Sequence, residues 1–295
     1  MKIDKIVITN TNFSSPQFIP PIAGGVRGVF LLLFLSVAAF SAEKLKLIIL
    51  HTNDTHSQVE PTENSNSNTA NMGGYARRMG VIDSIRSAEK NVLLVDAGDF
   101  SQGTPYFNFY NGRVEIDALN RMKYDAITLG NHEFDNGIDT LAVILKQAKV
   151  PVLSTNYALE KTPLHNFLKP YLILKRGGLR IGIITANIEP KGLIIESNYK
   201  GLIYNDAQKT ANEVASFLKH KKHCDIIICL SHLGVKSDYE LAGNSNDIDV
   251  IVGGHSHSLL ENVTAKNASG KSVIIAQIGK SGLYLGKIVL EIESK

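Results

Sequence analysis

The sequence predicts an α/β protein in which two mixed β-sheets are sandwiched between helices. In the first half, short Val, Ile and Leu runs that end in polar residues alternate with helical segments, which predicts parallel strands joined by crossover helices. A hairpin and several closing strands follow, and they add antiparallel pairing. With 44% hydrophobic and 20% charged residues, the composition excludes a disordered chain, a coiled coil and a disulfide-built scaffold.

In the first half, each apolar run is followed by polar or glycine-rich residues. The expected strands are 45–53, 91–99, 124–131 and 150–156. Apolar residues at helical spacing predict the connecting helices 73–90, 113–123 and 137–149. The polar segment 64–71 has no periodicity and is expected to be a loop. No internal repeat and no Pro/Gly/Ser linker divides the chain, which favours one domain.

The second half begins with a hairpin, residues 171–186, whose turn is expected at Gly177 and Gly178. A helix is expected next, over 205–223, with Asn205 or Asp206 as its N-cap. The remaining expected strands are 225–232, 247–255, 271–279 and 284–292. Cys224 and Cys229 are five residues apart on one apolar run, so they point to opposite faces of a strand and cannot bridge each other.

The amino-terminal segment is typical of an export signal. Residues 29–40 form an apolar run of 12 that is too short to span a bilayer, and Ala39 and Ser41 supply the small residues of a cleavage site. We therefore expect a signal peptide over 1–41, a mature chain over 42–295, no stable membrane anchor, and a periplasmic or extracellular location. A buried strand or an uncleaved anchor is the alternative.

The net charge of the whole chain is +3, which gives no reason to expect a nucleic acid polymer as a partner. The nine histidines are more informative, because several lie just past expected strands. In an open α/β sheet, ligand-binding groups gather at the carboxyl ends of the strands. The Asp, Asn and His residues at these ends are Asp54, His56, Asp99, Asn131, His132, His232, His255 and His257.

Any one of these strand ends is weak evidence, because a single histidine there is usually structural. Five of them carrying nitrogen and oxygen donors together indicate a metal site. Carboxylate, imidazole and amide donors suit divalent Zn, Mn, Fe or Co. The donors are too many for one tetrahedral ion, which favours two ions, and two ions a few ångströms apart can clamp a phosphoryl group during displacement.

The segments LIILHTNDTHSQV and YDAITLGNHEFD resemble the two signature segments of the 5′-nucleotidase branch of the calcineurin-like metallophosphoesterases. SHLG, GGHSH and the closing AQIGKSGLYLGKIVLEI are similar to later elements of the same catalytic domain, and the resemblance covers about residues 45 to 292. It implies a four-layer α/β/β/α fold. It also implies hydrolysis of phosphate monoesters, with 5′-nucleotides as the leading substrates, by attack of a metal-bound water or hydroxide.

The resemblance assigns roles to individual residues. One metal would be held by Asp54, His56, Asp99 and His257, and the other by Asp99, Asn131, His232 and His255, with Asp99 as the bridge. His132 would contact the phosphate and stabilise charge on the leaving oxygen. Asp135 would hold the His132 imidazole and favour its protonated form.

Two sets of neighbouring residues receive more modest interpretations. Glu133 is not expected to be a general base, because adjacent side chains after a strand diverge. Four aromatic residues are expected to pack in the core, although lining a substrate cleft is the alternative: Tyr106, Phe107, Phe109 and Tyr110.

Complete members of the resembled family carry a second, carboxy-terminal domain that binds the nucleoside, and this domain is expected to be absent from residues 42–295. A separate polypeptide could supply it as a partner. The alternative activities are a broad phosphomonoesterase and a 2′,3′-cyclic-nucleotide phosphodiesterase. A non-catalytic metal-binding or partner-binding subunit is the alternative from another class.

Overall fold

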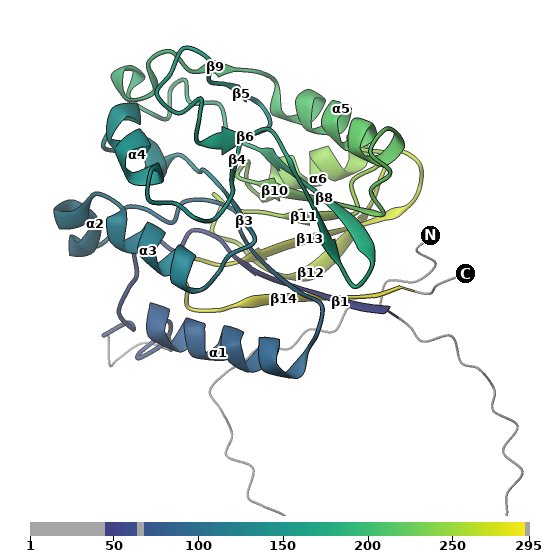
Figure 1. The fold of residues 1–295 in the computed structure, drawn as a ribbon, viewed down its shortest axis with the longest axis horizontal. Helices are drawn as coiled ribbons and strands as arrows, with labels where there is room; N and C mark the ends of the chain where they lie inside the picture. The colour runs from purple at the N-terminus through teal and green to yellow at the C-terminus, as the bar shows by residue number, and fades with distance from the viewer. Residues whose placement is uncertain (1–44, 64–67, 293–295) are drawn as a thin grey trace, which may run out of the picture.

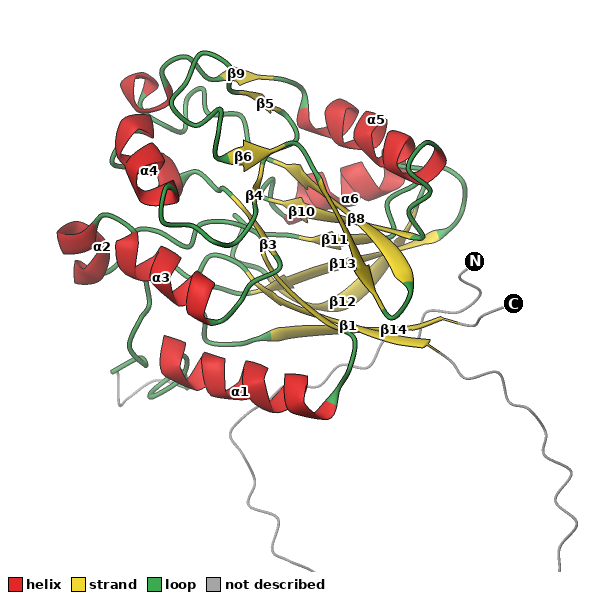
Figure 2. Ribbon diagram, in the orientation of Figure 1, coloured by secondary structure: helices red, strands yellow, loops and turns green. Residues whose placement is uncertain are grey.

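The computed structural model describes residues 45–63 and 68–292, and the expected signal peptide lies outside these residues. Two six-stranded mixed sheets pack against each other, and helices cover their outer faces (Figures 1 and 2). Three hydrophobic clusters fill the spaces between the layers. The expected α/β/β/α four-layer fold is therefore confirmed. Among the described residues, no helix has both the length and the apolar character needed to cross a membrane.

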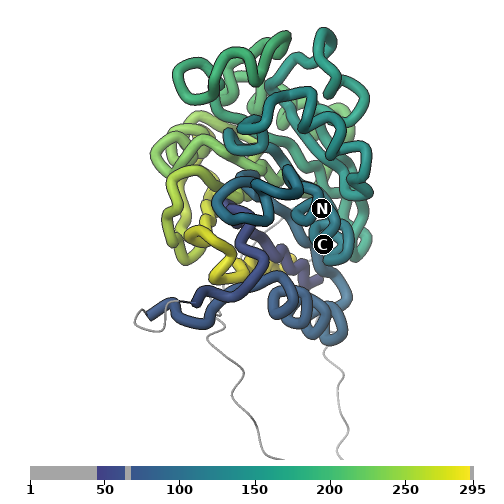
Figure 3. The backbone as a smooth tube through the Cα atoms, turned by 90° about the vertical axis from the view of Figure 1, so that its left-hand side faces the viewer, coloured from purple at the N-terminus to yellow at the C-terminus, as the bar shows by residue number. Residues whose placement is uncertain are grey.

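The first sheet has the strand order β14-β1-β2-β3-β4-β6. Its strands are β1 (Leu45–Thr52), β2 (Val92–Asp96), β3 (Ala126–Thr128), β4 (Val152–Leu153), β6 (Leu168–Lys169) and β14 (Gly286–Ile292). All neighbours are parallel except β14, which pairs antiparallel with β1. Figure 3 shows this pairing as purple and yellow segments that run side by side.

The second sheet has the order β12-β13-β11-β10-β8-β7. Its strands are β7 (Leu172–Arg176), β8 (Leu179–Ala186), β10 (Ile226–Ser231), β11 (Val250–Val252), β12 (Leu259–Lys266) and β13 (Ser272–Ile278). The four central strands are parallel, and the two edge strands, β7 and β12, pair antiparallel with their neighbours. A separate antiparallel pair joins β5 (Tyr157–Ala158) to β9 (Ile203–Tyr204).

Successive side chains of β1 point to opposite faces of the first sheet, and both faces are buried. Leu47 and Ile49 point into the cluster between the sheets, whereas Ile48 and Leu50 point into the cluster beneath the helices. A strand covered on both sides needs apolar residues at every position, which accounts for its continuous apolar sequence.

The helices are α1 (Tyr75–Ala88), α2 (Pro105–Tyr110), α3 (Arg113–Arg121), α4 (Ile138–Leu145), α5 (Ala207–His220) and α6 (Val235–Asn244), with short 3-10 turns η1 (His132–Phe134) and η2 (Glu196–Tyr199). Helices α1, α3 and α4 pack on the first sheet, and α5 and α6 pack on the second. Helix α5 is capped as expected, since the Asp206 carboxylate accepts the Lys209 backbone N–H at 2.7 Å. The hairpin expected over 171–186 is also confirmed.

Several elements differ from the expectations. Helices α2 and α6 and strand β12 were not predicted. Helix α2 is only six residues long, and β12 is a bulged edge strand in which half of the residues are exposed. The prediction of core packing is wrong for Phe109 and Tyr110, whose exposed fractions are 78% and 51%. It is confirmed for Phe107, which is buried. Cys224 and Cys229 are buried and unbridged, as expected.

Candidate metal centre

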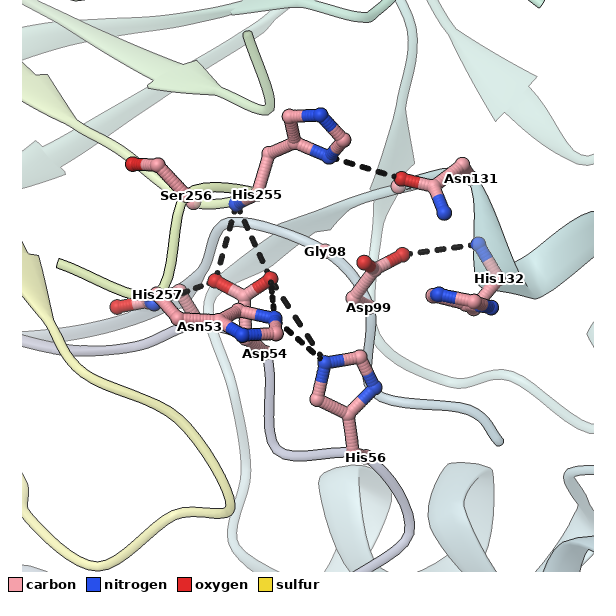
Figure 4. Close-up of polar contacts among 12 residues, drawn as sticks. Asn53, Asp54, His56, Gly98, Asp99, Asn131, His132, His255, Ser256 and His257 are labelled. Atoms are coloured by element: carbon pink, nitrogen blue, oxygen red, sulfur yellow. Dashed lines mark hydrogen bonds and ion pairs between the residues drawn. The ribbon is translucent and has the colours of Figure 1, made fainter. Parts of the chain in front are cut away.

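The carboxyl ends of five parallel strands, three from the first sheet and two from the second, meet at one edge of the sandwich. Figure 4 shows the side chains that follow β1, β2, β3 and β11 directed towards a common space. Contacts between the loops of different sheets hold the strand ends together. His232 Nδ1, after β10, lies 2.7 Å from the Ala97 carbonyl, after β2. The His255 backbone N–H, after β11, donates to both carboxylate oxygens of Asp54 at 3.0 Å.

The first donor group consists of Asp54, His56 and His257. The two imidazole Nε2 atoms are 3.0 Å apart, and Asp54 Oδ1 lies 3.5 Å from His257 Nε2 and 4.0 Å from His56 Nε2. Asn53 fixes the carboxylate, because its amide donates to Asp54 Oδ2 at 2.6 Å and to the Gly279 carbonyl at 2.8 Å. Three nitrogen and oxygen donors therefore converge on one point.

The second donor group consists of Asp99, His232 and His255, whose ligand atoms all lie within 4.8 Å of one another. His232 Nε2 faces Asp99 Oδ2 at 3.0 Å, while its Nδ1 is engaged by a backbone carbonyl. A ring nitrogen held in this way fixes the orientation and tautomer of a metal-binding histidine. Asn131 joins the group, because its Oδ1 lies 3.0 Å from His255 Nδ1.

Asp99 connects the two groups. Its carboxylate also lies within 4.8 Å of donor atoms of His56 and His132, in a third overlapping set. His132 is held at the rim, where its Nδ1 lies 2.9 Å from Asp135 Oδ2 and about a third of its side chain is exposed. All nine residues singled out by the sequence analysis are thus brought to one place.

The backbone at this edge adopts uncommon conformations. Five of the candidate ligands have positive φ, at 49° for Asp54, 45° for His56, 54° for Asp99, 72° for His255 and 53° for His257. Left-handed backbone costs a residue other than glycine roughly 1–2 kcal/mol. Such conformations persist where the surrounding structure enforces them, and they cluster at functional sites.

Close approach of two loops requires glycine at Gly98 and Gly130. A Cβ on Gly98 would lie 2.5 Å from the Gly130 nitrogen, and a Cβ on Gly130 would lie 2.2 Å from Asp99 Oδ1. The loops after β2 and β3 are therefore packed backbone to backbone. This contact places Asp99 beside His232, which arrives from the other sheet.

Burial raises the free-energy cost of keeping the carboxylates of the site ionised, and nearby cations can lower that cost. Burial raises the pKa of the Asp54 carboxyl to about 6 and lowers the pKa of His56 to about 4. Burial also opposes charge on Asp99 and His232, but their mutual attraction prevails: it holds the pKa of Asp99 well below its usual range and raises the pKa of His232 to about 10. Divalent ions would relieve the cost of keeping these carboxylates ionised.

Two buried residues that organise the loops were missed by sequence reasoning. One is Gln277, which donates to the Gly254 carbonyl at 2.9 Å and accepts from the Ser256 hydroxyl and the Ser258 N–H. These hydrogen bonds hold the loop that carries His255 and His257 at both of its ends. A polar residue within the apolar strand SVIIAQI was the available signal. The other is Glu133, which is 4% exposed and accepts three backbone N–H groups.

Two packed mixed sheets with an Asp, His and Asn cluster at their shared carboxyl edge define a metallophosphoesterase-type α/β sandwich. The model of the calcineurin-like phosphoesterase family matches residues 47–259. The chain therefore belongs to the calcineurin-like phosphoesterase family, whose members are metal-dependent phosphoester hydrolases with a dinuclear centre.

Relatives and solved structures agree with this placement. The chain is 35% identical to human 5′-nucleotidase over 300 residues, which cover 93% of this chain and 51% of that protein. It is 38% identical to the NAD 5′-nucleotidase of Haemophilus influenzae over 244 residues, which cover 79% of this chain and 40% of that protein. The crystal structure of a 5′-nucleotidase precursor from Thermus thermophilus matches with a TM-score of 0.76 at 34% identity, covering 84% of this chain and 55% of that one. The chain thus spans about half the length of the curated 5′-nucleotidases it matches.

Proposed function

We propose that this chain hydrolyses phosphate monoesters with the help of two divalent metal ions, and that 5′-nucleotides are its substrates. The observation that carries the proposal is a set of three overlapping donor groups, of which the middle one shares His56 with the first group and Asp99 with the last. Relatives named 5′-nucleotidase supply the substrate class.

The donors present fit two ions. We assign Asp54, His56, Asp99 and His257 to one ion, and Asp99, Asn131, His232 and His255 to the other. The orientation of His232 supports this assignment, because its Nδ1 is engaged by a backbone carbonyl and its Nε2 faces Asp99. Mixed nitrogen and oxygen donors suit Zn, Mn, Co or Fe. Such ions, when bound, polarise phosphoryl oxygens and lower the pKa of water.

The chain's own chemistry centres on His132 and Asp135. The hydrogen bond that His132 Nδ1 donates to the Asp135 carboxylate raises the pKa of His132, which favours the protonated imidazole. Because Nδ1 is engaged by Asp135, Nε2 is the atom that donates a hydrogen bond to the phosphate and stabilises negative charge on the leaving oxygen. Asp135 orients the ring and compensates its charge.

One relative favours a broader activity as the second candidate. The chain is 30% identical, over 84% of its length, to a Bacillus subtilis protein named trifunctional nucleotide phosphoesterase. Broad phosphomonoesterase or cyclic-nucleotide phosphodiesterase activity is therefore the alternative. A non-catalytic subunit is disfavoured, because the paired His132 and Asp135 would have no purpose in it.

The chain spans about half the length of its relatives, so the half that it does not match is a candidate for selecting the substrate. We propose that recognition of the nucleoside depends on a second domain, in the same or a separate polypeptide. We further propose export to the periplasm or cell exterior, on the strength of the apolar run 29–40 and its flanking residues.

The decisive experiment compares AMP, an aryl phosphate and a 2′,3′-cyclic nucleotide as substrates of metal-reconstituted protein, with and without an added carboxy-terminal nucleotidase domain. Preference for AMP, or its appearance on adding the domain, supports a nucleotidase, whereas equal rates on AMP and the aryl phosphate in both conditions contradict it. Asp99→Asn is the control and should lose both metal and activity.

A further inference from the structure

Glu133 lies beneath the candidate metal centre and is only 4% exposed. Its carboxylate accepts the backbone N–H groups of Asp99 at 3.0 Å, Ser101 at 2.9 Å and Gly130 at 2.6 Å. One side chain thus satisfies three buried backbone donors that belong to no helix or strand.

The three donors come from the two loops that carry candidate ligands. Asp99 and Ser101 belong to the loop after β2, whereas Gly130 precedes Asn131 in the loop after β3. Glu133 itself follows β3, so its carboxylate reaches across and ties the neighbouring loop to its own. The β2 loop needs this tie, because Asp99 has a positive φ of 54°.

A second carboxylate makes the same connection in the opposite direction. Asp99 Oδ1 accepts the backbone N–H of His132 at 2.9 Å, while the Asp99 backbone N–H donates to Glu133. The two loops are therefore locked by a reciprocal pair of carboxylate-to-amide hydrogen bonds. The orientation of the Asp99 side chain depends on these two hydrogen bonds. Glu133 holds the Asp99 backbone N–H, and the His132 N–H holds Asp99 Oδ1.

The same contacts exclude a role in proton transfer. Both carboxylate oxygens of Glu133 are occupied by backbone donors, and the side chain is closed off from solvent. The core anchors its position, because the next residue, Phe134, is fully buried and packs edge-on against Tyr157 with ring centroids 6.2 Å apart.

We infer that Glu133 is a positioning residue that fixes the geometry of Asp99, and thereby sets the affinity of the site for divalent metal. This inference rests on the proposed metal centre. Replacing a residue that orients a metal ligand typically weakens metal binding about 10- to 100-fold. Glu133→Gln is the sharpest variant, because it keeps the shape but turns an NH₂ group towards one of the three N–H donors.

The test is a calorimetric titration of metal-free protein with Mn²⁺, together with a chemical unfolding curve in the presence of a chelator. Wild type should bind Mn²⁺, and Glu133→Gln should bind at least one ion about 10- to 100-fold more weakly. Asp249→Asn is the matched control. Asp249 also accepts a backbone N–H, from Ile227 at 2.8 Å, but at the opposite end of β10. This control should lose stability and keep the wild-type affinity.

The outcomes separate the inference from the function on which it rests. If wild type binds no Mn²⁺, the proposed metal centre fails. If wild type binds and folded Glu133→Gln binds equally well, the positioning role is overturned while the metal centre stands. Should the Gln variant not fold, Glu133→Asp keeps the carboxyl group but is one methylene too short to reach all three amides. Undiminished Mn²⁺ affinity in that folded variant would equally overturn the inference.

Discussion

Gly130→Ala is expected to disable the metal centre by adding a single methyl group. The new Cβ would lie 2.2 Å from Asp99 Oδ1 and 2.6 Å from both Cε1 and Nε2 of His232. Ordinary contacts begin near 3.4 Å, so these side chains must move by roughly 1 Å. Metal–ligand distances tolerate only about 0.2 Å. At least one ion should therefore be lost, although the overpacking itself costs only about 1–3 kcal/mol of folding free energy.

The assay measures bound metal per chain after reconstitution, with thermal unfolding of the metal-free proteins alongside. Gly80→Ala is the control. Gly80 lies within α1, and a Cβ there would meet nothing within 4 Å. This control should bind metal normally and gain about 1 kcal/mol in stability, because alanine has the higher helix propensity. If Gly130→Ala binds two ions as tightly as wild type, the packing argument for the two loops is refuted.

Three further predictions concern the rim of the site, the loop that carries two ligands, and the core. His132→Ala should keep its metals and lower kcat about 10²- to 10⁴-fold, and loss of metal on analysis would show that this histidine is a ligand. Gln277→Leu should weaken metal binding about 10- to 100-fold in a chelator competition, because the loop bearing His255 and His257 loses the hydrogen bonds that hold it. Unchanged affinity would contradict a positioning role for Gln277. Burial lowers the pKa of His51 from 6.5 to about 4. Below pH 6.5 the unfolded chain takes up a proton that the folded chain refuses, so stability falls as the pH falls towards 4, by on the order of 3 kcal/mol from this group. His51→Gln should abolish this part of the loss in urea unfolding at pH 7 and pH 4.5, and an identical decline in both proteins would exclude His51 as its source.

Much of the fold could be predicted from local patterns. Continuous apolar runs marked the buried strands, because strands covered on both faces need apolar residues throughout. Asp206 marked the start of α5, because its carboxylate can satisfy a free backbone N–H. The half-exposed edge strand β12 and the short helix α2 carry no such pattern, so they could not be predicted.

The sequence by itself determined which donors the site contains, because parallel strands bring their carboxyl ends to one edge. It could not determine how those donors are aimed. The positive φ values of Asp54 and Asp99, and the contact between Gly98 and Gly130, arise from packing between loops far apart in the chain. The role of Glu133 was decided in the same way. A glutamate beside a histidine is chemically compatible with a base, and only the tertiary structure, by placing three backbone N–H groups around its carboxylate, makes it a support.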